Sequence, residues 1–234
     1  MTNYPWRSFD IETSLVELKD YNGESDIVLR CTQLHEGIYP KESDRKRILK
    51  EWCAFLRNNS TALKRLHITT RINQELFNAV CCQTELEELV IKWGLYPNLS
   101  PIVQLQNLKS LELGGSPSHK DLSPIAKLCS LENLRLDNFV GTTDYSVIGK
   151  LTELKTLGLH SSMHGIIKVE NLDFLNFTLH LKQLWTTGFR LLSHDYSPIL
   201  KLKELEWLSV NMPSYDWYKW NPILSERFSQ IMYK

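Results

Sequence analysis

The segments LKRLHI (63–68), LEELVI (86–91) and LKSLEL (108–113) begin a repeated pattern, L-x-x-L-x-[L/I/V/T], that fills the middle of the chain. Four more copies follow: LENLRL (131–136), LKTLGL (154–159), LKQLWT (181–186) and LEWLSV (205–210). Successive copies begin 23, 22, 23, 23, 27 and 24 residues apart. In each copy the last two apolar residues alternate with other residues, which is typical of a strand with one buried face. The repeat therefore predicts seven strands at a nearly constant period.

A second pattern precedes most of these strands and indicates a short helix. Its copies are NLSPIVQLQN (98–107), DLSPIAKLCS (121–130), DYSVIGKLTE (144–153) and DYSPILKLKE (195–204). We expect the serines to cap the first turn, since a hydroxyl can accept a backbone N–H there; they are Ser100, Ser123, Ser146 and Ser197. Proline suits the first helical position, and it stands there as Pro101, Pro124 and Pro198. Apolar residues then recur three apart, which suits a short α-helix or 3₁₀ turn.

One strand and one short helix cannot bury their own leucines, so neighbouring units must stack with their strands parallel. With these motifs, residues 60–213 resemble the leucine-rich repeat family, in particular its class of 22–23-residue repeats found in internalins and phosphatase-regulatory proteins. The resemblance implies an α/β solenoid. It has a parallel concave sheet, short helices or 3₁₀ turns on the convex side, and divergent capping segments at both ends.

Two departures from the family predict an irregular solenoid. The family usually places Asn three residues after the last strand leucine, and this chain has other residues there: Arg71, Gly94, Ser116, Phe139, Ser162, Phe189 and Pro213. The unit that begins at Leu154 has about four extra residues, and Thr186 replaces the strand leucine of the next unit. We expect irregular curvature here, with a longer helix or a projecting loop.

The ends differ from the repeats (63–213) and are predicted to cap them. Residues 1–62 contain a strand pattern from Ser25 and an amphipathic helix pattern over 41–59, whose inward residues would be Ile48, Leu49, Trp52, Phe55 and Leu56. We interpret this segment as a strand–helix cap or divergent first repeat, with a separate functional domain as the alternative.

Residues 214–234 are interpreted as a C-terminal capping tail. Asn221 would cap a helix with Pro222 at its first position, and its packing face would consist of Ile223, Leu224, Phe228, Ile231 and Met232. The preceding cluster of Trp217, Tyr218 and Trp220 is the alternative, because such a group can also serve recognition.

Composition argues against several classes of protein. The chain has 27 basic and 27 acidic residues and no charged tail, which argues against a nucleic-acid binder that works through phosphate contacts. It shows neither an export signal nor a membrane-length apolar run, so we expect a cytoplasmic protein. The five cysteines lack metal-ligand spacing, and we expect them to be reduced and at least partly buried.

No arrangement in the sequence predicts catalysis, a cofactor or a metal. Ser193, His194 and Asp195 are adjacent, so their side chains cannot converge as a triad. His160 and His164 have a spacing of four, but that spacing brings side chains together only on a helix. We interpret both as solvent-exposed histidines where a strand passes into a loop.

The residues between the leucines point to the concave face, which makes that face the predicted binding surface. The residues we assign to partner binding are Arg65, Glu88, Lys92, Trp93, Glu112, Arg135, Asp137, His160, Trp185 and Trp207. Trp185 and Trp207 would anchor the partner, while the charged residues would orient it. Two alternatives stay open: the charges pair only with each other along the sheet, as Arg65 with Glu88, Glu112 with Arg135 and Asp137 with His160, or the indoles pack against the C-terminal tail.

The resulting hypothesis is a non-enzymatic protein-binding module, monomeric when free, that recognises a folded protein. An inhibitor or toxin-neutralising immunity protein is favoured, because we see no second functional domain. A regulatory or scaffold subunit of an enzyme complex is the alternative. A nucleic-acid-binding or catalytic role is disfavoured, and we expect no membrane partner.

Overall fold

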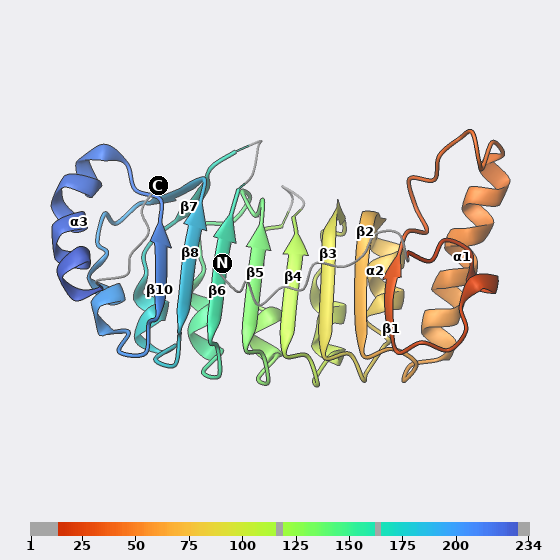
Figure 1. The fold of residues 1–234 in the computed structure, drawn as a ribbon, viewed down its shortest axis with the longest axis horizontal. Helices are drawn as coiled ribbons and strands as arrows, with labels where there is room; N and C mark the ends of the chain where they lie inside the picture. The colour runs from red at the N-terminus through yellow and green to blue at the C-terminus, as the bar shows by residue number, and fades with distance from the viewer. Residues whose placement is uncertain (1–13, 116–118, 162–164, 229–234) are drawn as a thin grey trace.

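A computed structural model describes residues 14–115, 119–161 and 165–228, and its main feature is a parallel sheet of eight strands (Figure 1). The strand order is β1-β2-β3-β4-β5-β6-β8-β10. The strands are β1 (Asp26–Leu29), β2 (Arg65–Asn73), β3 (Glu88–Leu95), β4 (Ser110–Gly114), β5 (Asn133–Asp137), β6 (Thr156–His160), β8 (Gln183–Thr187) and β10 (Trp207–Val210). The last seven are the predicted repeat strands, and each pairs with its neighbour in the predicted parallel arrangement.

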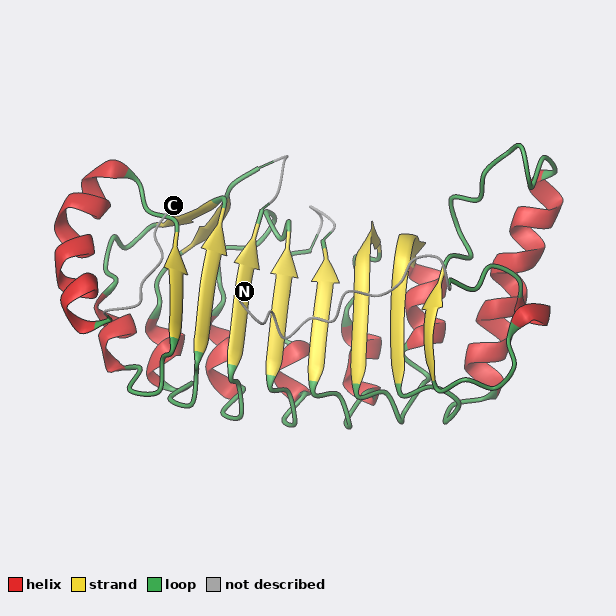
Figure 2. Cartoon of the chain, in the orientation of Figure 1, coloured by secondary structure: helices red, strands yellow, loops and turns green. Residues whose placement is uncertain are grey.

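Short helices lie on one side of the sheet and longer helices flank its two ends (Figure 2). The 3₁₀ helices are η2 (Leu18–Asp20), η3 (Ser100–Gln104), η4 (Ile125–Lys127), η5 (Ser146–Lys150), η6 (Asp173–Asn176) and η7 (Ser197–Lys201). The α-helices are α1 (Glu42–Asn58), α2 (Gln74–Val80) and α3 (Ser214–Arg227). We call the sheet side turned away from the 3₁₀ helices the concave face. The α/β solenoid and its 3₁₀ turns are therefore as predicted.

The turns before the short helices are held by Asp or Asn rather than by the predicted serine caps. Asp121 Oδ1 accepts the backbone N–H of Ser123 at 2.8 Å, and Asp144 does the same for Ser146 at 2.8 Å. Equivalent bonds, 2.9–3.0 Å long, run from Ser100 N to Asn98, from Asp173 N to Asn171 and from Ser197 N to Asp195. The prediction was wrong because an Asx side chain two residues earlier reaches this amide, while the serine already belongs to the turn.

The long unit after β6 forms neither a longer helix nor only a loop. It contains a short strand, β7 (Ile167–Val169), which pairs in parallel with β9 (Phe189–Leu191) as a second, two-stranded sheet. Both strands have alternating burial, since Ile167 and Val169 are buried on either side of exposed Lys168. The extra residues thus extend the buried layer behind the main sheet.

Leucines form the core, and a row of stacked rings crosses it. Phe77 stacks on Tyr96, and His119 stacks on Phe139, with ring centroids 4.9 and 4.8 Å apart. Tyr96 and His119, also 4.9 Å apart, join these pairs into one row. All four side chains are fully buried. Phe139 occupies a position where the family usually has Asn, so ring packing fills this place in the present chain.

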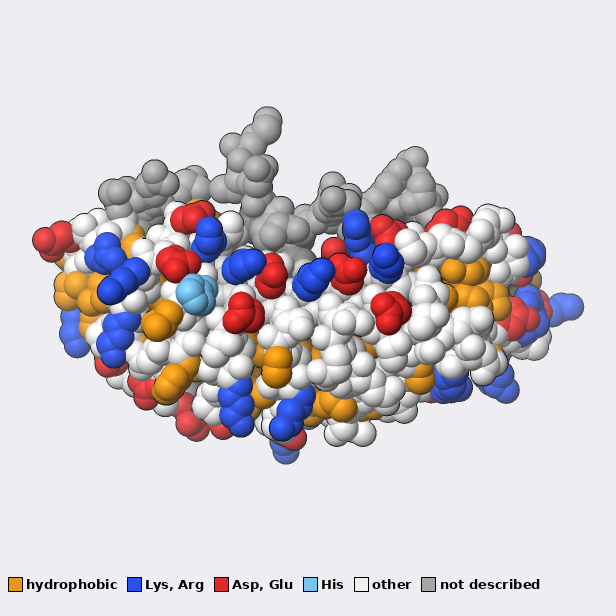
Figure 3. Space-filling model, turned by 90° about the horizontal axis from the view of Figure 1, so that it is seen from below, with side chains coloured by type: hydrophobic (Ala, Val, Ile, Leu, Met, Phe, Trp, Pro, Cys, Tyr) orange, Lys and Arg blue, Asp and Glu red, His pale blue; other side chains and the backbone are white. Residues whose placement is uncertain are grey.

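Acidic and basic side chains alternate along the edge where the strands begin, and Figure 3 shows them side by side. Three pairs join neighbouring repeats: Lys109 with Glu87 at 2.9 Å, Lys155 with Glu132 at 2.8 Å, and Lys182 with Glu206 at 3.1 Å. All three are exposed, and such pairs contribute at most about 1 kcal/mol each. Their main effect is to favour the correct alignment of successive repeats.

The N-terminal part packs as the sequence pattern indicates. β1 extends the main sheet beside β2, and α1 buries Ile48, Trp52 and Leu56. The Trp52 indole donates a hydrogen bond of 2.8 Å to the carbonyl of Val16. Among the five free cysteines, Cys129 is exposed rather than buried as predicted, because it stands in the turn after η4.

Helix α3 begins seven residues before the predicted cap at Asn221, so Pro222 lies inside it. The helix buries Asp216, Trp220 and Leu224, which are four residues apart and form one stripe. This stripe explains the earlier start, because Trp220 of the aromatic cluster belongs to the packing face. Ile223 is exposed, and the predicted contacts of Ile231 and Met232 lie outside the described residues. No helix in the described part of the chain is long and apolar enough to cross a membrane.

Candidate binding face

The concave face presents side chains in columns, because each strand is in register with the next. One column contains Arg65, Glu88, Ser110, Asn133, Thr156, Gln183 and Trp207. The next contains Val28, His67, Val90, Glu112, Arg135, Gly158, Trp185 and Ser209. These columns are those that the repeat pattern predicts. The register shifts only between Ile68 and Arg71 of β2, which places Arg71 beside Trp93.

The charged side chains of these columns pair in part as predicted. Arg135 Nη1 lies 3.4 Å from Glu112 Oε2, and both side chains are mostly buried. Glu88 and Arg65 are aligned but do not pair, since Glu88 Oε1 lies 2.7 Å from His67 Nε2 and Arg65 pairs with Asp26 at 3.5 Å. Arg65 and Glu88 are therefore neighbours in the sheet, but the ion pair considered as an alternative does not form, because each residue has another partner.

Two carboxylates near Arg135 are poorly stabilised. Burial raises the pKa of Glu112; Arg135 partly offsets this increase, while Asp137 and Glu88 add to it. Burial also raises the pKa of Asp137, again partly offset by Arg135. Asp137 Oδ1 is buried with no hydrogen-bond partner among the described residues. The Arg135 guanidinium is thus the positive charge that offsets both carboxylates, and this part of the face is acidic.

Trp185 is buried rather than freely exposed as the sequence suggested. The residue is only 3% exposed, and its ring lies over Gly158, where an added Cβ would come within 2.5 Å of the indole. The ring of Trp207 contacts it edge-on, with centroids 5.9 Å apart. The missing side chain at Gly158 creates the space that Trp185 fills. Trp207 is half-buried and presents the more accessible ring of the pair.

His160 is not the exposed loop histidine that we expected. It is the last residue of β6, its ring packs edge-on against Trp185, and the two side chains are hydrogen-bonded. Burial lowers its pKa to about 4, and the charge of Arg135 lowers it as well. His160 is therefore neutral at pH 7 and does not pair with Asp137, its neighbour in the sheet. His164 lies outside the described residues.

The N-terminal half of the face has a different character. Lys92 and Trp93 are exposed near the end of β3, and the Arg71 guanidinium lies 5.2 Å from the centre of the Trp93 ring. The sequence pattern did not single out Arg71 for binding, because an unbroken register from Ile68 and Ile91 would place Thr70 beside Trp93. The shift at Thr69 and Thr70 has no clear signal in the repeat pattern.

The remaining chemical candidates form structural contacts. His194 Nδ1 lies 3.0 Å from the carboxylate of buried Asp216, and the Trp220 indole donates to the carbonyl of His194 at 2.9 Å. These bonds attach α3 to the last repeats. Within the described ranges, no group of three His, Cys, Asp or Glu side chains is arranged to hold a metal ion.

Comparison with solved structures agrees with this geometry. An internalin of Listeria monocytogenes is similar at 20% identity and a TM-score of 0.52, over 74% of this chain and 47% of the internalin. The chain has the leucine-rich-repeat fold. Internalin C2 of the same organism matches this leucine-rich-repeat chain at 20% identity and a TM-score of 0.47, over 74% and 72% of the two chains. A leucine-rich-repeat protein of Leptospira interrogans matches at 14% identity and a TM-score of 0.42, over 74% and 49%.

This leucine-rich-repeat chain thus spans about half the length of the first internalin. No protein-family model and no curated protein matches its sequence.

Proposed function

We propose that this leucine-rich-repeat chain is a non-enzymatic, cytoplasmic module that binds one folded protein on its concave face and inhibits it, as a toxin-neutralising immunity protein does. The observation that carries the proposal is the mostly buried pair of Glu112 and Arg135, with Asp137 beside it and Trp207 two strands beyond His160 along the sheet. Such a mixture of an aromatic ring and incompletely paired charges is typical of recognition surfaces.

The face is well suited to recognition because its side chains are held in place before binding. Parallel strands fix the columns, and Trp185 holds both His160 and Trp207. Binding to a preorganised surface costs less conformational entropy than binding to a mobile one. The face contains no catalytic arrangement within the described residues, so its effect on a partner would come from covering the partner's surface.

Affinity capture tests the proposal. The full chain, carrying a tag, is used to capture proteins from its native cells, and the variants Trp207→Ala and Arg135→Gln are compared with Tyr218→Ala on the exposed side of α3. We expect one partner that is retained by the Tyr218 variant and lost by the other two, and whose activity falls in the complex. Retention of that partner by all three variants would contradict binding through the concave face.

Inhibition is tested separately, with the purified partner. Loss of the partner's own activity on titration with this chain supports the inhibitor proposal. Unchanged or increased activity in a stable complex would instead favour a regulatory or scaffold subunit.

A further inference from the structure

Two adjoining hollows lie at the N-terminal end of the solenoid, away from the Glu112 region. The larger has a volume of about 390 Å³ and lies between the segment after β1 and the start of α1. The smaller has a volume of about 240 Å³, and its walls include Arg71, Ile72 and Leu95. Thr32 and Gln33 line both hollows, so the two lie on either side of this short segment.

The segment between the hollows is fixed to β2 by its side chains. Thr32 Oγ1 donates a hydrogen bond of 2.5 Å to the carbonyl of Arg71, and Gln33 Oε1 accepts the backbone N–H of Arg71 at 2.8 Å. Gln33 has a φ of 51°, a left-handed conformation that is uncommon for a residue other than glycine. The hydrogen bond to Arg71 holds this conformation, and residues held in this way cluster at binding sites.

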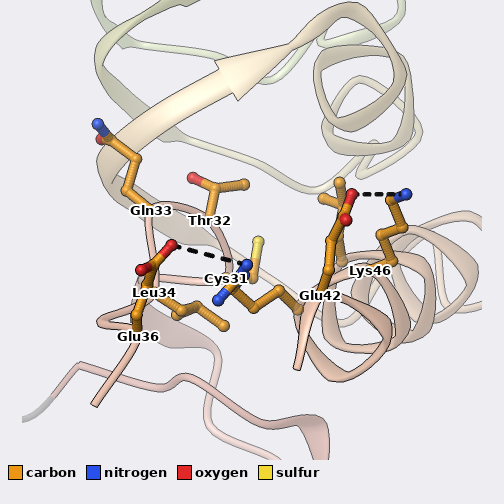
Figure 4. Close-up of a pocket in the computed structure, with 9 residues that line it drawn as sticks. Cys31, Thr32, Gln33, Leu34, Glu36, Glu42 and Lys46 are labelled. Carbon is orange, nitrogen blue, oxygen red and sulfur yellow. Dashed lines mark ion pairs between the residues drawn. The ribbon is translucent and has the colours of Figure 1, made fainter. Parts of the chain in front are cut away.

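The larger hollow is already neutralised by its own residues. Lys46 pairs with Glu42 at 2.7 Å, and Arg45 pairs with Glu36 at 3.8 Å (Figure 4). The labelled side chains of Figure 4 place the two carboxylates on opposite sides of Cys31 and Thr32. This hollow therefore offers a mixed polar and apolar surface without a strong preference for either charge.

The smaller hollow does have such a preference. Ile72 and Leu95 are its apolar lining residues; Ile72 is buried, whereas Leu95 is 51% exposed although it is aliphatic. Arg71 lines this hollow, its guanidinium lies 5.2 Å from the centre of the Trp93 ring, and no carboxylate in the described part of the chain pairs with it. A guanidinium stacked on an indole keeps its N–H edge available and binds a carboxylate through two parallel hydrogen bonds.

We propose that these hollows bind an extended segment of a protein partner in which an aliphatic side chain stands next to an acidic one. The aliphatic side chain enters the hollow beside Ile72 and Leu95, and the carboxylate pairs with Arg71. The segment continues past Gln33 into the larger hollow. Because the two hollows adjoin at Thr32 and Gln33, an internal stretch of chain can contact both. Trp93 is also one of the residues assigned to the concave face, but this site lies at its N-terminal end, and the peptide test below does not require binding at the Glu112 region.

Titration of the full chain with two short peptides tests the site. The probes are acetyl-Gly-Leu-Glu-Gly-amide and its glutamine analogue, and the readout is the NMR signals of the Ile72 and Leu95 methyl groups. We expect saturable shifts with the glutamate peptide and roughly tenfold weaker binding of the glutamine peptide, since a charge-assisted hydrogen bond contributes more than a neutral one. Absence of saturable shifts, or equal binding of both peptides, would overturn the proposal.

Matched variants identify the residues responsible. Arg71→Gln should weaken binding of the glutamate peptide roughly tenfold. Arg190 is an exposed arginine in β9, and Arg190→Gln should leave this binding unchanged. Leu95→Ser should also weaken binding, and circular dichroism checks that each variant is folded. Unchanged binding by Arg71→Gln would contradict the proposal. If the free chain dimerised and Arg71→Gln abolished that dimer, the hollows would bind a second copy of the chain. This result would also overturn the proposal.

Discussion

The Arg135 guanidinium lies 3.4 Å from the carboxylate of Glu112 across strands β4 and β5, and only 18% of the Glu112 side chain is exposed. Burial nevertheless raises the pKa of Glu112, so its charged form is less stable in the folded chain than in water. A carboxylate kept charged in such a place does not serve stability. We propose that Glu112 belongs to a surface that a partner completes.

This explanation predicts that Glu112→Gln separates stability from binding. A carboxyl group whose pKa is raised by folding lowers the free energy of unfolding at pH values above the pKa that the group has in the unfolded chain. Removal of the charge should therefore not destabilise the free chain at pH 7. We expect an unchanged value or an increase of up to about 1 kcal/mol in urea unfolding, because Arg135 still has Asp137 nearby. A clear loss of stability would show that the pair is structural.

His119 should make the fold sensitive to acid. Burial lowers its pKa from 6.5 to about 4, so unfolding takes up a proton between these values and the free energy of unfolding falls as the pH falls. From pH 7 to pH 5 the loss from this residue is about 2 kcal/mol. His119→Phe keeps the ring between Tyr96 and Phe139 and should reduce the loss. His160, whose pKa is also about 4, supplies a further part. An identical pH dependence in wild type and variant would refute this assignment.

Gly158→Ala should displace Trp185, because the added Cβ would lie 2.5 Å from the indole. We expect the free energy of unfolding to fall by about 1–3 kcal/mol, with a change in tryptophan fluorescence in the folded state. Ser209→Ala, on the other side of Trp185 in the same column, is the control and should change neither quantity greatly. If Gly158→Ala matched the control, the packing described for Trp185 would be incorrect.

Helix α3 should stabilise the C-terminal end of the solenoid chiefly through Trp220. This side chain is 6% exposed, whereas that of Tyr218 is 80% exposed. We expect Trp220→Ala to lower the free energy of unfolding by about 3–5 kcal/mol and Tyr218→Ala by less than about 0.5 kcal/mol. Thermal and urea unfolding of both variants measures the difference. Similar values for the two would argue against a capping role for the helix.

The repeat strands could be predicted from sequence because leucine at fixed spacing determines which side chains are buried. The same spacing predicted the columns that contain Glu112 and Arg135. Features that depend on packing between repeats were not predictable in this way. The burial of Trp185 depends on Gly158 in the neighbouring strand β6, and the position of Arg71 depends on an irregularity in β2. The early start of α3 follows from burial of Trp220. It was not predicted, because Asn221 and Pro222 indicate a later helix start.

Site-specific photo-crosslinking tests most directly whether a folded protein binds the concave face. A photoreactive phenylalanine derivative is placed at Ser110 or Gln183, which are half-buried on that face, and as a control at Val103, which is exposed on η3. Illumination in native cells should give one discrete protein adduct from Ser110 and Gln183 and none from Val103. An adduct from Val103 alone, or no adduct from either concave position, would contradict the account.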